Sequence, residues 1–131
     1  MPQREDRSSL RTDGAFQRSD LVGRWRLRSY TTGDVYPNGR DARGVLDYSV
    51  DGKVSVHIMG NGYFAYYGDY TVDEAGRSVT HRLELCSDSK LAGVSNVRYV
   101  NLDGRRLTLT GTMQFNGQTR EIRVEWERDD D

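Results

Sequence analysis

Two pairs of turn-forming residues, Asp103-Gly104 and Asn116-Gly117, constrain the fold of this chain more than any other feature. Both pairs favour the positive φ angles that the tip of a two-residue β-hairpin requires, and alternating apolar and polar residues flank each of them. They predict three consecutive antiparallel strands within the stretch Val94–Arg128.

The two hairpins can be compared because directly opposed residues share one face of a sheet. The first turn is expected to place Val100 opposite Leu107 and Arg98 opposite Leu109, and the second to place Leu109 opposite Val124. Both registers bring one apolar set to a single face, which we expect to be the core face: Leu107, Leu109, Met113, Phe115, Ile122, Val124 and Trp126. Three polar residues have the same parity: Asn96, Arg98 and Arg120.

The rest of the chain repeats this pattern of strands and turns. Strand-like segments are expected at about residues 22–31, 44–50, 53–59, 66–72 and 77–86, and nothing predicts a long helix. Eight consecutive antiparallel strands favour an all-β fold, an up-and-down β-barrel whose interior holds one small ligand. The tight turns fall at one end and the longer loops at the other, so we expect an open mouth, with Phe16 and Leu21 plugging the closed end.

The pattern gives one inward face for residues 22–31, 66–72 and 77–86 and two alternatives for residues 44–50 and 53–59. Trp25, Leu27 and Ser29 are expected on one face, and a four-residue turn after Val72 is expected to place Tyr70 opposite Val79. The same turn gives an apolar face of Tyr66, Tyr70, Val72, Val79, Leu83 and Leu85, with His81 among them opposite Gly68. A two-residue turn at Asp51-Gly52 leaves two candidate inner faces. One holds Gly44, Leu46, Tyr48, Ser55, His57 and Met59, and the other holds Val45, Asp47, Ser49, Val54, Val56 and Ile58.

Size and charge exclude several classes of protein. The 131 residues suit one domain, which we expect at residues 19–131 after a polar, flexible tail at 1–18. A net charge of −1 without a basic run argues against nucleic-acid binding, and no apolar stretch is long enough for a membrane span. The N-terminus lacks the apolar core of a signal peptide, and the single cysteine excludes an internal disulfide, so a cytoplasmic location is expected.

The segment Leu21-Val22-Gly23-Arg24-Trp25 resembles the Gly-x-Trp opening of the lipocalins, in which the tryptophan packs near the closed end against a late arginine. Arg128 is the counterpart that this resemblance implies. More specifically, residues 21–30, 36–44, 51–59, 70–81 and 97–109 resemble the bacterial and fungal lipocalin-like domain family, a small calycin-type barrel, over about residues 21–128. The resemblance implies a ligand-binding barrel, and members often occur beside natural-product biosynthetic enzymes. Unlike the secreted lipocalins, this chain has no disulfide pair.

His81 is the candidate general acid or base, because an imidazole exchanges protons near neutral pH without a cofactor. The alternative is a core histidine hydrogen-bonded to a tyrosine such as Tyr70. Arg98 is the candidate that contacts an anion or a developing enolate, since a buried cation without a partner is costly. The alternatives for Arg98 are stacking on an aromatic ring and pairing with Asp47.

Several other inward residues are candidates for contacts with the ligand. Arg120 either contacts it or extends from the mouth into water. The remaining candidates either bond the ligand or fill the barrel: Tyr48, His57, Tyr66, Tyr70, Asn96, Met113 and Trp126. The sequence Gly60-x-Gly62-x-x-Ala65 follows a strand but precedes another strand, so we reject a dinucleotide site there. The spacing of histidine and cysteine predicts no metal site.

Two functions remain open. The first is a cofactor-independent isomerase, cyclase or dehydratase that acts on an oxygenated, largely apolar, acidic or enolisable metabolite. The second is a carrier that binds such a molecule without changing it. A homodimer is possible through three outward residues: Tyr67, Val97 and Tyr99.

Overall fold

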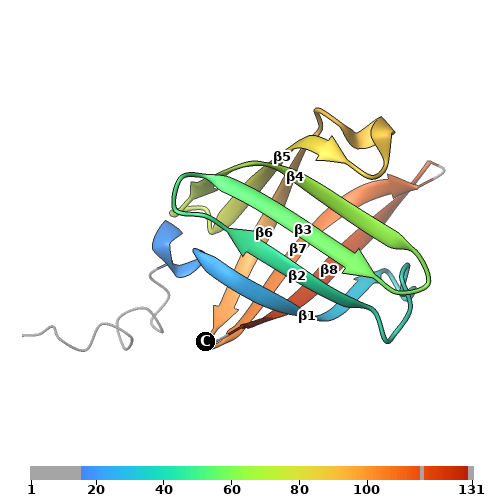
Figure 1. Cartoon of the computed structure of the whole chain (residues 1–131), viewed down its shortest axis with the longest axis horizontal. Coiled ribbons are helices and arrows are strands. Elements are labelled where there is room, and N and C mark those ends of the chain that lie inside the picture. The colour runs from blue at the N-terminus through green and yellow to red at the C-terminus, as the bar shows by residue number, and fades with distance from the viewer. Residues whose placement is uncertain (1–15, 116, 130–131) are drawn as a thin grey trace, which may run out of the picture.

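The chain forms a closed barrel of eight antiparallel strands, in which each strand pairs with its neighbours in the sequence and β8 pairs with β1 (Figure 1). The computed structural model describes residues 16–115 and 117–129. The strands are β1 (Gly23–Thr32), β2 (Arg43–Tyr48), β3 (Lys53–Met59), β4 (Tyr63–Asp73), β5 (Ser78–Cys86), β6 (Ser95–Asp103), β7 (Arg106–Phe115) and β8 (Gln118–Arg128). Two short 3-10 helices accompany them, η1 (Arg18–Asp20) and η2 (Ser89–Leu91). The predicted all-β, up-and-down architecture is confirmed.

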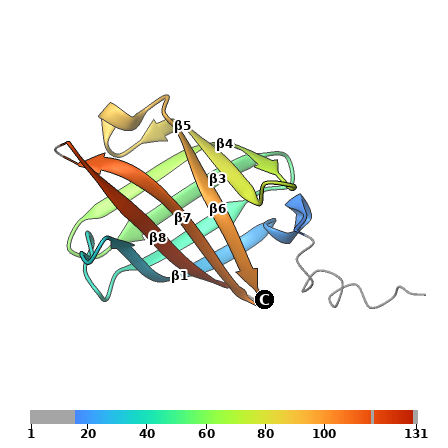
Figure 2. The ribbon, with the colours of Figure 1, turned by 180° about the vertical axis from the view of Figure 1, so that it is seen from behind.

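The predicted register of the last hairpin is confirmed, whereas that of the hairpin before it is wrong by two residues. Strands β6, β7 and β8 lie side by side (Figure 2). Strands β7 and β8 pair Leu109 with Val124, but β6 and β7 pair Val100 with Leu109 instead of Leu107. The loop is Gly104-Arg105, and Gly104 has a φ of 60°. Glycine at the first central position is typical of a type II′ turn, which moves the tip one residue along the chain. A shift of two residues preserves the face, so Arg98 still points inward.

The hairpin between β2 and β3 has three loop residues and not two. Tyr48 pairs with Val54 and Leu46 with Val56, and Gly52 has a φ of 93°. The extra residue is typical of a turn that ends with a glycine in the left-handed region. Because of this extra residue, the inner face takes Leu46 and Tyr48 from one predicted set and Val54, Val56 and Ile58 from the other, and all five are buried. Both candidate faces were therefore wrong as complete sets, and His57 is exposed.

The turn between β4 and β5 also lies one residue further along than predicted. Tyr70 pairs with His81 and not with Val79, because Arg77, at a φ of 53°, is part of the turn. Gly68 pairs with Leu83 but Tyr67 pairs with Leu85, so Glu84 is an extra residue that forms a bulge in β5. The alternation of β5 reverses beyond this bulge, and Leu85, which we expected inside, is 64% exposed.

A second bulge interrupts β1 between Leu27 and Ser29. Beyond it Ser29 pairs with Glu125, while Tyr30 pairs with Val124, whose side chain is buried. The expectation that Ser29 points inward is therefore wrong, and Tyr30 takes the inward position.

The predicted plug at the closed end is confirmed. Phe16 and Leu21 are buried in the core, and the indole Nε1–H of Trp25 donates to the Leu21 carbonyl oxygen at 2.9 Å. The Arg128 Cζ atom lies 4.0 Å from the centroid of the Trp25 ring, and the guanidinium donates to the Val22 carbonyl oxygen at 2.7 Å. Arg128 is thus the late arginine that packs on the opening tryptophan.

The other predictions concern the chain ends and the outer wall. Residues 1–15 of the expected tail and the Phe115 side chain lie outside the described residues, so the division at residue 18 stays a prediction. Tyr67, Val97 and Tyr99 are exposed as expected, at 39%, 46% and 58%, and the homodimer stays a prediction. None of the helices in the described part of the chain is long and apolar enough to cross a membrane.

Candidate functional site

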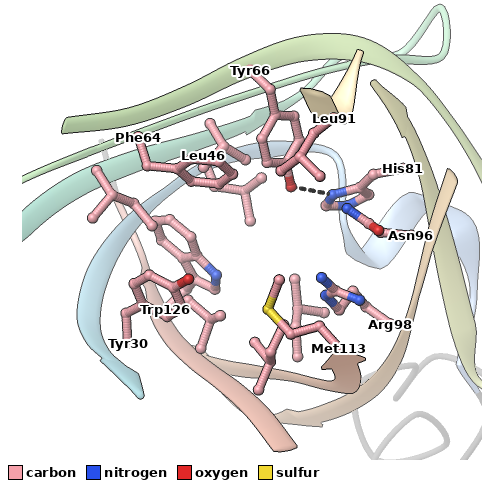
Figure 3. A pocket seen from close by; sticks show the side chains of 15 residues that line it. Tyr30, Leu46, Phe64, Tyr66, His81, Leu91, Asn96, Arg98, Met113 and Trp126 are labelled. Carbon is pink, nitrogen blue, oxygen red and sulfur yellow. Dashed lines mark hydrogen bonds between the residues drawn. The ribbon is translucent and has the colours of Figure 1, made fainter. Parts of the chain in front are cut away.

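A cavity of about 80 Å³ lies inside the barrel, and Figure 3 shows the side chains around it. Its apolar lining comes from five strands and η2: Leu46, Val56, Ile58, Phe64, Leu91, Leu109, Met113, Ile122 and Val124. Its polar or amphipathic lining is Tyr30, Tyr66, His81, Asn96, Arg98 and Trp126. None of the described residues that line the cavity is acidic. An apolar cavity with a few converging hydrogen-bonding groups is typical of a small-molecule site.

Three residues from β2, β4 and β5 form a hydrogen-bonded chain at one side of the cavity. The hydroxyl of Tyr48 lies 2.6 Å from His81 Nε2, and the hydroxyl of Tyr66 lies 2.6 Å from His81 Nδ1. The His81 side chain is 1% exposed. Burial, and then the charge of Arg98, lower the pKa of His81 to about 3, so the imidazole is neutral near pH 7.

The surroundings of Tyr48 determine which nitrogen of His81 carries the proton. The Tyr48 hydroxyl is buried, and among the described residues it has only His81 as a partner. It must therefore donate to Nε2, because otherwise its own proton would be buried without an acceptor. The proton of the ring is then on Nδ1 and is donated to the Tyr66 oxygen. The Tyr66 O–H remains available to the cavity, into which the hydroxyl points (Figure 3).

Arg98 provides a cation in the cavity wall. Its Nη1–H donates to the Val97 carbonyl oxygen at 3.0 Å, and no described residue forms a salt bridge with it. Pairing with Asp47 is ruled out, because Asp47 bonds Arg24 at 3.2 Å on the outer wall. Burial lowers the pKa of Arg98, and its charge opposes the rise that burial causes in the pKa of Tyr66.

Gly111 makes room for this arginine. A methyl group on Gly111 would lie 2.8 Å from Arg98 Nη1 and 3.2 Å from Arg98 Cδ. Any side chain there would have to displace Arg98, so the glycine allows the guanidinium to lie against β7.

Trp126 also presents a polar atom to the cavity. Its side chain is 2% exposed, and its Nε1 has no hydrogen-bond partner among the described residues. Trp25, the other tryptophan, has its Nε1–H satisfied by Leu21.

The structure brings together six of the ten predicted site residues around the cavity: Tyr66, His81, Asn96, Arg98, Met113 and Trp126. Tyr48 lies behind His81. Tyr70 lies towards the closed end, where its hydroxyl donates to the Ser49 carbonyl oxygen at 2.6 Å. Neither Tyr48 nor Tyr70 lines the cavity. The other two predicted residues lie further away: His57, whose Nδ1 is 3.2 Å from the Tyr63 hydroxyl on the exterior, and Arg120, which lies near Gly33.

Sequence reasoning missed Tyr30, Phe64 and Leu91 as lining residues. Tyr30 depends on the bulge in β1, and Phe64 lies in a part of β4 that was expected to be a loop. Leu91 belongs to η2, which carries no strand pattern. His81 is a buried histidine hydrogen-bonded to tyrosine, as the predicted alternative had it, but its partners are Tyr48 and Tyr66 and not Tyr70.

The described residues include no group of three or more histidine, cysteine, aspartate or glutamate side chains arranged to hold a metal ion.

Comparison with known families supports the resemblance seen in the sequence. The family model of the lipocalin-like domain matches residues 58–129, which is more than half of the chain. The chain belongs to the lipocalin-like domain family. A search of curated proteins found no match. The lipocalin-like barrel and its largely apolar cavity indicate binding of a small, hydrophobic molecule.

Proposed function

We propose that this lipocalin-like protein binds an oxygenated, largely apolar small molecule with an acidic or enolisable group. We propose further that it acts on this molecule as a cofactor-independent isomerase, cyclase or dehydratase of secondary metabolism. The single observation that carries the proposal is the position of the hydrogen-bonded chain Tyr48–His81–Tyr66 beside the unpaired guanidinium of Arg98.

The Arg98 guanidinium would bind the acidic group of the ligand, and the reacting oxygen would lie at the Tyr66 hydroxyl. As an enolate forms, the proton on carbon passes to solvent water, the Tyr66 hydroxyl donates to the oxygen that gains negative charge, and the nearby cation of Arg98 stabilises that charge. His81 acts through Tyr66, because tyrosine hydroxyls occupy both of its ring nitrogens. In this proposal Tyr66 and Arg98 contact the substrate, and His81 is a positioning residue that orients Tyr66.

The same geometry favours a second candidate, a carrier without turnover. A histidine with a pKa of about 3 stores a proton poorly at neutral pH, and burial raises the pKa of Tyr66 as well. Both groups would still hold a ligand oxygen by hydrogen bonds. The two candidates therefore share one binding site and differ only in proton transfer.

Hydrogen–deuterium exchange at carbon separates the two candidates. The protein is incubated in D₂O with 4-oxocyclohexanecarboxylate, an acid with enolisable C–H groups, and exchange beside the ketone is followed by NMR. We expect exchange above the rate without protein, and a fall of at least about a hundredfold in Tyr66→Phe, within the range for a positioned acid or base.

Tyr48→Phe is the matched control, because it removes the other hydroxyl of the chain, which does not reach the cavity. We expect it to lower exchange less than Tyr66→Phe does. Binding of the keto acid with exchange no faster than in buffer would refute the enzyme and favour the carrier.

A further inference from the structure

The indole N–H of Trp126 is a buried hydrogen-bond donor that finds no acceptor within residues 16–115 and 117–129. Its Nε1 has no partner among the described residues, although the side chain is 2% exposed. A donor in such a position loses its bond to water and gains none from the protein. Figure 3 shows the indole nitrogen pointing into the cavity, so the acceptor has to come from whatever occupies that space.

Arg98 lies across the cavity from this donor. In Figure 3 the guanidinium and the Trp126 indole lie on opposite sides, with Met113 between and below them. Arg98 donates one bond to Val97 and lacks a salt bridge within the described residues. The guanidinium therefore has donors left for an anionic group on the same ligand.

Tyr66 adds a third donor to the polar wall, beside Tyr30 and Asn96, whose hydroxyl and amide groups can both donate and accept. The Tyr66 O–H is available to the cavity once Tyr48 has fixed the tautomer of His81. The lining residues that the structure describes include no carboxylate, so a ligand with ammonium or guanidinium groups would find no ionic partner among them. The chemistry of the wall matches a ligand that supplies acceptors at two separate places.

We propose that the ligand is a small oxo acid or closely related acid, bound through its anionic oxygens at Arg98 and through a second, neutral acceptor at Trp126 Nε1–H. This inference rests on the proposed binding function and names its ligand class. The second acceptor is a ketone, ether or hydroxyl oxygen, and an apolar ring or short chain spans the two anchors against Leu109, Ile122 and Val124.

The cavity volume limits the part of the ligand that lies between the anchors. An engineered cavity of about 150 Å³ binds benzene, whereas this cavity measures about 80 Å³. One six-membered ring therefore requires lining side chains to move. Met113 and Leu91 suit this adjustment, since methionine is unbranched and Leu91 belongs to the short helix η2.

NMR of the two indole N–H groups tests the inference in the intact wild-type chain. The sequence has two tryptophans, and Trp25 serves as an internal reference because it already bonds the Leu21 carbonyl. The probes are 3-oxo- and 4-oxocyclohexanecarboxylate, with cyclohexanecarboxylate and cyclohexanone as single-anchor controls. We expect a keto acid to shift the Trp126 signal downfield, as a new hydrogen bond does, and to leave the Trp25 signal in place.

Affinities provide the second measurement. We expect the better keto acid to bind about fivefold to tenfold more tightly than cyclohexanecarboxylate, as one added hydrogen bond allows. Trp126→Phe keeps an aromatic ring but removes the N–H. It should abolish that advantage and change the affinity for cyclohexanecarboxylate by less than about twofold.

The outcomes separate this inference from the proposed function. Equal affinities of keto acid and plain acid, an unmoved Trp126 signal, or no binding of either keto acid would overturn the inference. Deuterium exchange into a keto acid while the Trp126 signal stays in place would support the proposed function and overturn this inference. Movement of that signal without exchange would support the inference and refute the enzymatic part. The wild-type spectra decide these points even if Trp126→Phe does not fold.

Discussion

The burial of His81 predicts that the protein loses stability in mild acid. The pKa of His81 is about 3 in the folded protein, against about 6.5 in an unfolded chain. Unfolding therefore takes up a proton at this residue once the pH falls below about 6.5. The contribution is complete above that pH and is lost progressively as the pH falls towards the folded pKa.

The size of the effect follows from these two pKa values. Relative to neutral pH, His81 alone should lower the free energy of unfolding by about 1.4 kcal/mol near pH 5.5 and by about 2.7 kcal/mol near pH 4.5. Between these values the slope approaches about 1.4 kcal/mol for each pH unit. The unfolded pKa sets both numbers, since the folded imidazole stays largely neutral throughout this range.

Urea denaturation of the wild type and of His81→Gln at several pH values measures the effect. Glutamine offers a donor and an acceptor to Tyr48 and Tyr66 but does not titrate. The variant should be less stable at neutral pH, and its deficit should shrink towards acid by the amounts above. Carboxylates titrate in both proteins, so the difference between the two curves isolates His81.

His57→Gln is the matched control, because it replaces the other histidine, which is exposed. A difference between wild type and His81→Gln that stays constant with pH would refute the burial argument. If the pH dependence of stability disappeared in His57→Gln and not in His81→Gln, then His57 and not His81 would be its cause.

Three further predictions concern the arginines and Gly111. Arg98→Met should weaken an acidic ligand by about 2–5 kcal/mol and hardly affect a neutral analogue, as isothermal titration of both would show; equal losses would make Arg98 structural. Gly111→Ala should weaken acids by about tenfold in the same titration, because the new methyl would lie 2.8 Å from Arg98 Nη1, and an unchanged affinity would contradict that crowding. Arg128→Met should lower the free energy of unfolding by about 2–3 kcal/mol in urea, since the Val22 and Asp20 carbonyl oxygens lose charged donors; a loss below about 0.5 kcal/mol would contradict this role.

The fold and the inward position of Arg98 were determined by the sequence itself. Alternation of apolar and polar residues has a period of two, and the Asn116-Gly117 signal pairs Leu109 with Val124 as expected. Even the misplaced tip at Gly104 preserved the face of Arg98, because a shift of two residues returns each side chain to the same side. The packing of Arg128 on Trp25 was implied by the resemblance to the lipocalins, and the structure has it.

Single-residue insertions into the strand pairing were decided by the tertiary structure. The bulges in β1 and β5 and the third loop residue between β2 and β3 each reverse the alternation beyond them. They direct Tyr30 inward and leave His57 and Leu85 exposed. Whether a strand bulges depends on the pairing available from its neighbours in a closed barrel, and adjacent residues in the sequence do not contain that information.

The site depends on both levels. Parity along β5 predicted that His81 points inward, but its two hydrogen bonds require Tyr48 and Tyr66 from two other strands to arrive at its two nitrogens. The sequence likewise placed Trp126 on the core face. Only the packing around it showed that its N–H remains without a partner among the described residues while that of Trp25 is satisfied. Hydrogen-bond satisfaction depends on distances of a few ångströms between residues far apart in the chain, and these distances exist only once the barrel has closed.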